Sequence, residues 1–106
     1  MSTVRIDETF VLAAVNLGMT KANNATKELN YLASIGYLNS QTGLDKAEEV
    51  KEHLMKAYAL LDKVDLPNAK DTRTALAATI AAQDLIIHRI EGSKNLKERL
   101  EELGLN

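Results

Sequence analysis

Apolar residues recur along this chain at steps of three and four, the spacing that places side chains on one face of an α-helix. The clearest pattern covers residues 45–64, where a seven-residue repeat of apolar positions is separated by Lys, Glu and Asp. Its apolar positions are Ala47, Val50, Leu54, Ala57, Leu61 and Val64. Residues 69–91 carry a second long pattern. No segment has the features of a strand, so the sequence predicts an all-α fold.

Pro67 separates these two long helices, because proline lacks a backbone N–H and disfavours helix at the residue before it. Asp45, followed by Glu48, resembles a capping box and is expected to start the first of them. The short link around Pro67 makes residues 45–64 and 69–91 an antiparallel hairpin. The residues expected in its core are Leu54, Leu61, Leu76, Ile80 and Ile87, with Gln83 interrupting the apolar face.

Shorter helices are expected on both sides of the hairpin. Asp7 is expected to cap a first helix that ends near Leu17, with Phe10, Ala14 and Leu17 on one face. Gly18 then interrupts the pattern, and Thr20 starts a second helix that Gly36 ends. After the hairpin, Gly92 is a natural helix end, and Ser93 is expected to cap a last short helix closed by Gly104. The sequence therefore predicts one domain, residues 1–106, folded as a bundle of four or five helices.

The composition limits the kinds of core and chemical site that the chain can form. The 106 residues include one Phe, three Tyr and no Trp, so the core must be aliphatic. The absence of Cys excludes disulfides, thiolate nucleophiles and Cys-type zinc sites. No run of about 18 apolar residues could span a bilayer, and the start lacks the layout of a signal peptide. We therefore expect a cytoplasmic protein that does not bind membranes.

The charges are nearly balanced, with 13 basic and 15 acidic side chains and a net charge of −2. No segment has the basic excess that phosphate binding normally requires. The chain also lacks a Gly-rich phosphate loop, a Gly-x-Ser-x-Gly elbow and a Cys–His pair. We therefore expect no enzyme activity and no cofactor.

Residues 10–38 suggest one specific function. They read FVLAAVNLGMTKANNATKELNYLASIGYL, with Ala14 four residues before Gly18. The spacing of Ala25, Leu29, Leu32 and the Gly36-Tyr37-Leu38 exit resembles the recognition helix of winged-helix DNA-binding regulators. This resemblance implies that residues 20–34 enter a DNA major groove. Asn23 and Asn24 would then read base edges, and Lys21 and Lys27 would contact phosphates. The alternative is a helical hairpin that simply packs on the bundle.

Two pairs of residues suggest a metal site. Glu49 and His53 are four residues apart on one long helix, and Asp84 and His88 are four apart on the other. Each pair shares a helix face, and an antiparallel hairpin places Glu49 at about the level of Asp84. Two His and two carboxylates form a ligand set that metal-binding bundles use. The alternative is two exposed pairs, each within its own helix.

Two further features suggest self-association. Leu96, Leu100 and Leu103 form a stripe that must pack either on the same chain or on another subunit. Thr72, Thr79 and Gln83 lie along or beside the apolar face, and polar residues in a helix seam often set register and oligomeric state. We therefore expect a non-enzymatic interaction or regulatory module that forms a homo-oligomer through helix faces and binds another protein. A DNA-binding regulator and a metal-binding bundle are the alternatives, and a small ligand is left open.

Overall fold

The computed structural model of this protein describes residues 2–65 and 67–105, with side chains from residue 8 onward. It contains three helices in this part of the chain: α1 (Ser2–Ser34), α2 (Gln41–Leu61) and α3 (Ala69–Glu102). No strand occurs among the described residues. The predicted all-α class is confirmed, but the prediction of four or five helices is wrong.

The error in helix number comes from two glycines. α1 begins at Ser2, not Asp7, and continues unbroken through Gly18 and Thr20, and α3 continues through Gly92. Neither glycine has a positive φ. A glycine inside a helix costs only about 0.5–1 kcal/mol relative to alanine, which is too little to end a long helix.

Gly36 and Gly104 do end helices, as the sequence predicts. Their φ angles are 81° and 69°, in the left-handed region that favours glycine. The backbone N–H of Tyr37 donates to the carbonyl of Leu32 at 2.8 Å, and that of Leu105 donates to Leu100 at 2.9 Å. Both helices therefore close with the Schellman arrangement, which satisfies their last carbonyl groups.

The bounds of α2 differ from those predicted. Its N-cap is Ser40, whose hydroxyl accepts a hydrogen bond from the Gly43 N–H at 3.2 Å, so Asp45 lies inside the helix. α2 ends at Leu61 instead of Val64, although Val64 is still buried beyond the helix end. α3 begins at Ala69, as predicted.

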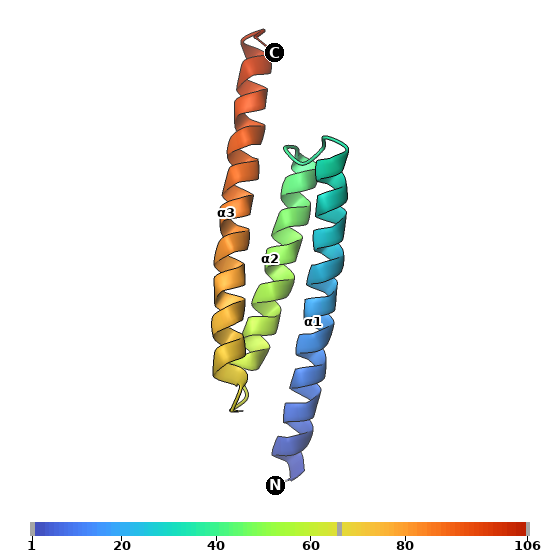
Figure 1. Cartoon of the computed structure of the whole chain (residues 1–106), viewed down its shortest axis with the longest axis vertical. Helices are drawn as coiled ribbons and strands as arrows, with labels where there is room; N and C mark the ends of the chain where they lie inside the picture. The colour runs from blue at the N-terminus through green and yellow to red at the C-terminus, as the bar shows by residue number, and fades with distance from the viewer. Residues whose placement is uncertain (1, 66, 106) are drawn as a thin grey trace.

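α2 lies between the other two helices (Figure 1). Both α1 and α3 pack against α2, whereas the α1 and α3 backbones do not come together. The predicted antiparallel hairpin is thus formed by α2 and α3, with α1 added on the other side of α2. The molecule is a narrow, elongated layer of 67 × 20 × 17 Å. α3 extends past the α1–α2 connection at one end, and α1 extends past the α2–α3 connection at the other (Figure 1).

The core consists of two clusters of buried side chains along α2. The larger contains Val15, Ala22, Ala25, Val50, Leu54, Ala57, Leu61, Val64, Ala69 and Leu76. The smaller contains Leu29, Leu44, Ala47 and Ile90. The predicted burial of Leu54, Leu61 and Leu76 is confirmed, whereas Ile80 and Ile87 are half-buried at the edges of the clusters.

Small residues bring α1 close to α2. A Cβ added at Gly18 would lie 3.5 Å from the Cβ of Ala57, and Ala22 and Ala25 are almost fully buried along the same face of α1. This face packs on α2, so Phe10 and Leu17 remain exposed and Ala14 is half-buried. The grouping of Phe10, Ala14 and Leu17 as one apolar face therefore did not identify the packed side of α1.

Candidate interaction surfaces

The four residues expected to contact DNA lie in the middle of α1. Lys21, Asn23, Asn24 and Lys27 are all exposed. Because each residue advances a helix by about 100°, Lys21 and Asn23 lie on opposite flanks of the buried Ala22. The α1 helix is continuous here, so the turn of a helix-turn-helix is not formed between Gly18 and Ala25. DNA binding by these residues stays a prediction.

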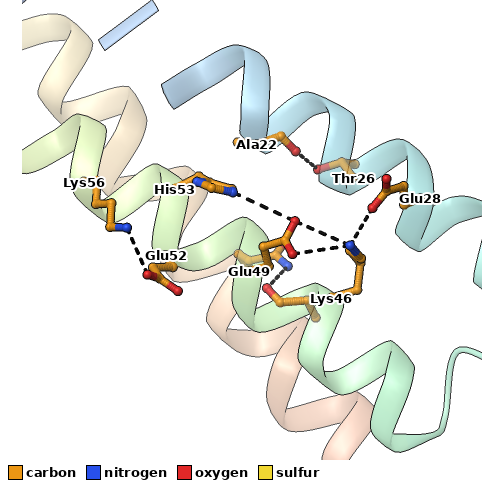
Figure 2. Close-up of polar contacts among 10 residues, drawn as sticks. Ala22, Thr26, Glu28, Lys46, Glu49, Glu52, His53 and Lys56 are labelled. Atoms are coloured by element: carbon orange, nitrogen blue, oxygen red, sulfur yellow. Dashed lines mark hydrogen bonds and ion pairs between the residues drawn. The ribbon is translucent and has the colours of Figure 1, made fainter. Parts of the chain in front are cut away.

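Glu49 and His53 lie on the flank of α2 that faces α1 (Figure 2). The Glu49 carboxylate is 3.9 Å from His53 Nε2 and 3.3 Å from the Lys46 ammonium. Lys46 also forms an ion pair with Glu28 of α1. The bond to Glu28 is the main cause that raises the pKa of Lys46. The Glu49 carboxylate is therefore part of a small charged network that links α1 to α2.

Asp84 and His88 lie on α3, where Asp84 forms a different ion pair. The Lys51 ammonium donates to the Asp84 carboxylate at 2.7 Å, and this bond is the main cause that lowers the pKa of Asp84. His88 Nδ1 lies 2.8 Å from the Asp84 backbone carbonyl.

The structure does not bring the two predicted metal-binding pairs together. Glu49 belongs to the network with α1, whereas Asp84 pairs with Lys51 across the α2–α3 contact. Among the described residues, no group of three or more His, Cys, Asp or Glu side chains is arranged to hold a metal ion.

The polar residues along the seam have partners within the chain. The buried Gln83 side chain donates from Nε2 to the backbone carbonyl of Ala47 on α2, at 2.9 Å. The hydroxyls of Thr72 and Thr79 donate to backbone carbonyls four residues earlier, those of the N-cap residue Asn68 and of Ala75. The sequence marked Gln83 as an interruption of the apolar face, but its partner lies 36 residues away and could not be identified from the spacing.

Exposed apolar side chains follow both outer helices. On α1, Phe10, Leu17 and Tyr31 occupy positions of one heptad repeat and are 75%, 56% and 63% exposed. On α3, Leu85, Leu96 and Leu103 share the face opposite α2, since steps of 11 and 7 residues return to the same side of a helix. The sequence analysis named Leu96 and Leu103 of the α3 row and grouped Phe10 and Leu17 of the α1 row on one face, but it did not indicate that the α1 face is exposed.

A shallow apolar groove runs between α2 and α3. The part of the groove beside the C-terminal half of α2 has a volume of about 370 Å³. It is lined by Met55, Tyr58, Ala59, Ala77 and Ile80. Towards the N-terminal end of α2 it continues to Ile87, with Lys51 and Glu52 at its rim. The open groove offers apolar contact, but no cluster of reactive groups lies in it.

Comparisons with protein-family models, curated proteins and solved structures give no match to this chain. Among the described residues, no helix is long and apolar enough to cross a membrane.

Proposed function

We propose that this protein is a non-enzymatic helical interaction module that acts through the faces of its outer helices and associates with copies of itself. The observation that carries this proposal is the open layer of three helices. α2 is covered on two sides, whereas α1 and α3 each pack on α2 alone and carry a row of exposed large apolar side chains.

Such rows are unusual on a protein that acts alone. Single exposed apolar residues are normal, but extended apolar patches on small proteins typically mark sites of interaction. Leu17 of α1 and Leu85 of α3 lie on stretches whose other faces are buried against α2 in the core clusters. Binding a partner there therefore requires little additional ordering of the backbone.

The non-enzymatic part of the proposal draws on the ionisable side chains. Lys51 and Asp84 form an ion pair between α2 and α3. Glu49 pairs with Lys46 of its own helix, and Lys46 in turn pairs with Glu28 of α1. The sequence also offers none of the nucleophile or phosphate-loop patterns that common enzyme classes use. The charged residues thus have structural roles that explain their positions.

Sedimentation velocity across about 1–300 µM protein tests the self-association, a range suited to small and weak interfaces. We expect the weight-average mass to rise with concentration above that of the 11.6 kDa chain. A mass that stays at one chain over the whole range would contradict self-association.

DNA binding is the alternative proposal, and all four of its side chains are accessible on α1. Fluorescence anisotropy with a labelled DNA duplex at about 50 and 200 mM salt tests it, because phosphate contacts weaken steeply over that range. Salt-sensitive binding that Lys21→Ala/Lys27→Ala reduces would favour the alternative. The matched control is Lys70→Ala/Lys97→Ala, which removes two exposed lysines outside residues 20–34.

A further inference from the structure

We propose that the cavity between α1 and the start of α3 is a binding site for a small neutral carboxamide. This inference goes beyond self-association, because none of the residues of the two exposed apolar rows lines this cavity. It gives the small ligand, which the sequence leaves open, both a place and a chemical class.

The cavity lies at the end of the molecule where the α2–α3 connection is. Its volume is about 440 Å³, within the range of about 300–1,000 Å³ that is typical of small-molecule pockets. α1, the end of α2 and the start of α3 all contribute to its lining. The α1 and α3 backbones do not come together, which leaves this space between them. Spaces between the helices of a bundle are frequent ligand sites.

Core side chains form the base of the cavity. Val15, Leu61 and Ala69 line it and are only 6%, 3% and 4% exposed. All three belong to the larger core cluster, so helix packing holds these walls in place. Leu12 and Pro67 add apolar surface nearer to the solvent. A ligand with an apolar body would remove this surface from water, which stabilises the complex.

Uncharged polar side chains form the rim. Asn16 of α1, Asn68 of the connection and Thr72 of α3 line the cavity and are exposed. Asn68 is the N-cap residue of α3, but its side chain makes no capping hydrogen bond. Asparagine is among the preferred N-cap residues because its side chain usually makes that bond. The Asn68 carboxamide is therefore not engaged by the helix that it precedes.

These rim groups determine the chemical class of the ligand. The two asparagines offer N–H donors and carbonyl acceptors. The Thr72 hydroxyl already donates its proton to the Asn68 backbone carbonyl at 3.1 Å, so towards a ligand it acts as an acceptor. A ligand carboxamide has the matching N–H donors and carbonyl acceptor. None of the described residues that line the cavity is ionisable, so a charged ligand would lose hydration without gaining an opposite charge.

Three probes of the same shape test the site and the ligand class. Benzamide is neutral, benzoate is its anionic counterpart and benzamidine is a cation at neutral pH. In a proton–nitrogen correlation NMR titration, benzamide should shift the backbone amides of Val15, Ala69 and Thr72 saturably. We expect a dissociation constant of about 1–10 mM, the weak affinity of so small a fragment. Benzoate and benzamidine should bind at least about tenfold more weakly.

Two variants test the polar rim. Thr72→Val keeps the shape of an exposed side chain and removes its hydroxyl, so the benzamide dissociation constant should rise about three- to tenfold. The matched control is Thr74→Val, since the Thr74 hydroxyl also donates to a carbonyl four residues earlier but does not line the cavity. Asn16→Ala should weaken binding to a similar extent. Asn23→Ala, at another exposed asparagine of α1, is its control and should bind benzamide as wild type does.

Each outcome decides a separate part of the proposal. Saturable shifts around the cavity, with weaker binding of both charged probes and of the two rim variants, would support it. No saturable shift at up to about 20 mM benzamide would overturn the site. Shifts centred on Met55 and Ile80 would also overturn it, because they would place the probe in the α2–α3 groove. Equal binding of the three probes, or wild-type affinity in both rim variants, would overturn the chemical class.

Discussion

Gln83 of α3 donates a hydrogen bond from Nε2 to the backbone carbonyl of Ala47 on α2, at 2.9 Å. Ala47 is fully buried, and Gln83 is the buried polar residue of the described chain. A carbonyl oxygen has two lone pairs, so this bond adds to the helical bond of α2 without replacing it. The pair fixes the position of α3 along α2, which an all-apolar seam leaves less precisely defined.

Gln83→Glu should replace this attractive hydrogen bond with repulsion between two oxygen acceptors. At pH 7 the new carboxylate would be buried opposite a carbonyl oxygen, and we expect a loss of about 2–3 kcal/mol in the free energy of unfolding. Burial raises the pKa of such a carboxyl above its unfolded value of about 4.3. The loss should therefore shrink as the pH falls through the raised pKa, because the protonated group donates again. Urea unfolding at pH 7 and pH 4.5 checks this, with Gln83→Leu as the control that should show no such pH dependence.

Gly18→Ala should stabilise the protein. The added Cβ would make ordinary contact with Ala57 at 3.5 Å, and alanine favours the helical backbone by about 0.5–1 kcal/mol over glycine. Thermal unfolding should show a higher midpoint. A lower midpoint would indicate that residues 18–25 form a turn, as a helix-turn-helix requires. Gly92→Ala, where the new Cβ meets nothing within 4 Å, provides the same test for the continuity of α3.

Gly43→Ala should have the opposite effect. Its Cβ would overlap the carbonyl oxygen of Leu38, so the backbone of the α1–α2 connection would have to move. We expect a loss of about 2 kcal/mol or more in the free energy of unfolding. Urea unfolding alongside Gly18→Ala checks the contrast. A neutral Gly43→Ala would contradict the close approach of Leu38 to the start of α2.

Asp84→Asn should change the acid stability. The Lys51 bond holds the pKa of the Asp84 carboxyl below its usual range, so its contribution is present above the unfolded pKa of about 3.9. That contribution is lost as the pH falls through the lower folded pKa. The stability difference between wild type and Asp84→Asn should therefore be largest near pH 6 and shrink as the pH falls below the unfolded pKa. Urea unfolding across this range checks it, and added salt should reduce the difference at pH 6.

Leu61→Ala tests the position of the core. Leu61 is 3% exposed in the larger cluster, and removing a fully buried leucine side chain typically costs about 2–5 kcal/mol. Ile80→Ala should cost less, since Ile80 is only half-buried. Leu85→Ala, at an exposed position, should change the unfolding free energy by less than about 0.5 kcal/mol. Equal losses at Leu61 and Leu85 would contradict this assignment of the core.

Local chemistry determined much of this structure. The spacing of apolar residues identified the α2–α3 hairpin and its seam. Gly36 and Gly104 marked real helix ends, because their positive φ angles act through the backbone itself. Gly18 and Gly92 are also glycines, but they lie inside continuous helices and do not end them. The small penalty of a helical glycine is outweighed when the helix on both sides of it packs or continues. A sequence pattern does not show whether the free energy gained in this way exceeds the penalty.

The tertiary structure alone decided which faces are covered and which charges meet. α1 has one face with Gly18, Ala22 and Ala25 and another with large apolar side chains interrupted by Asn24. The small face packs on α2, because it allows close contact over several turns. Likewise, Asp84 was placed beside His88 by sequence spacing, but its strongest partner is Lys51, 33 residues away. Contacts of this kind depend on how helices are rotated about their axes, which no single helix determines.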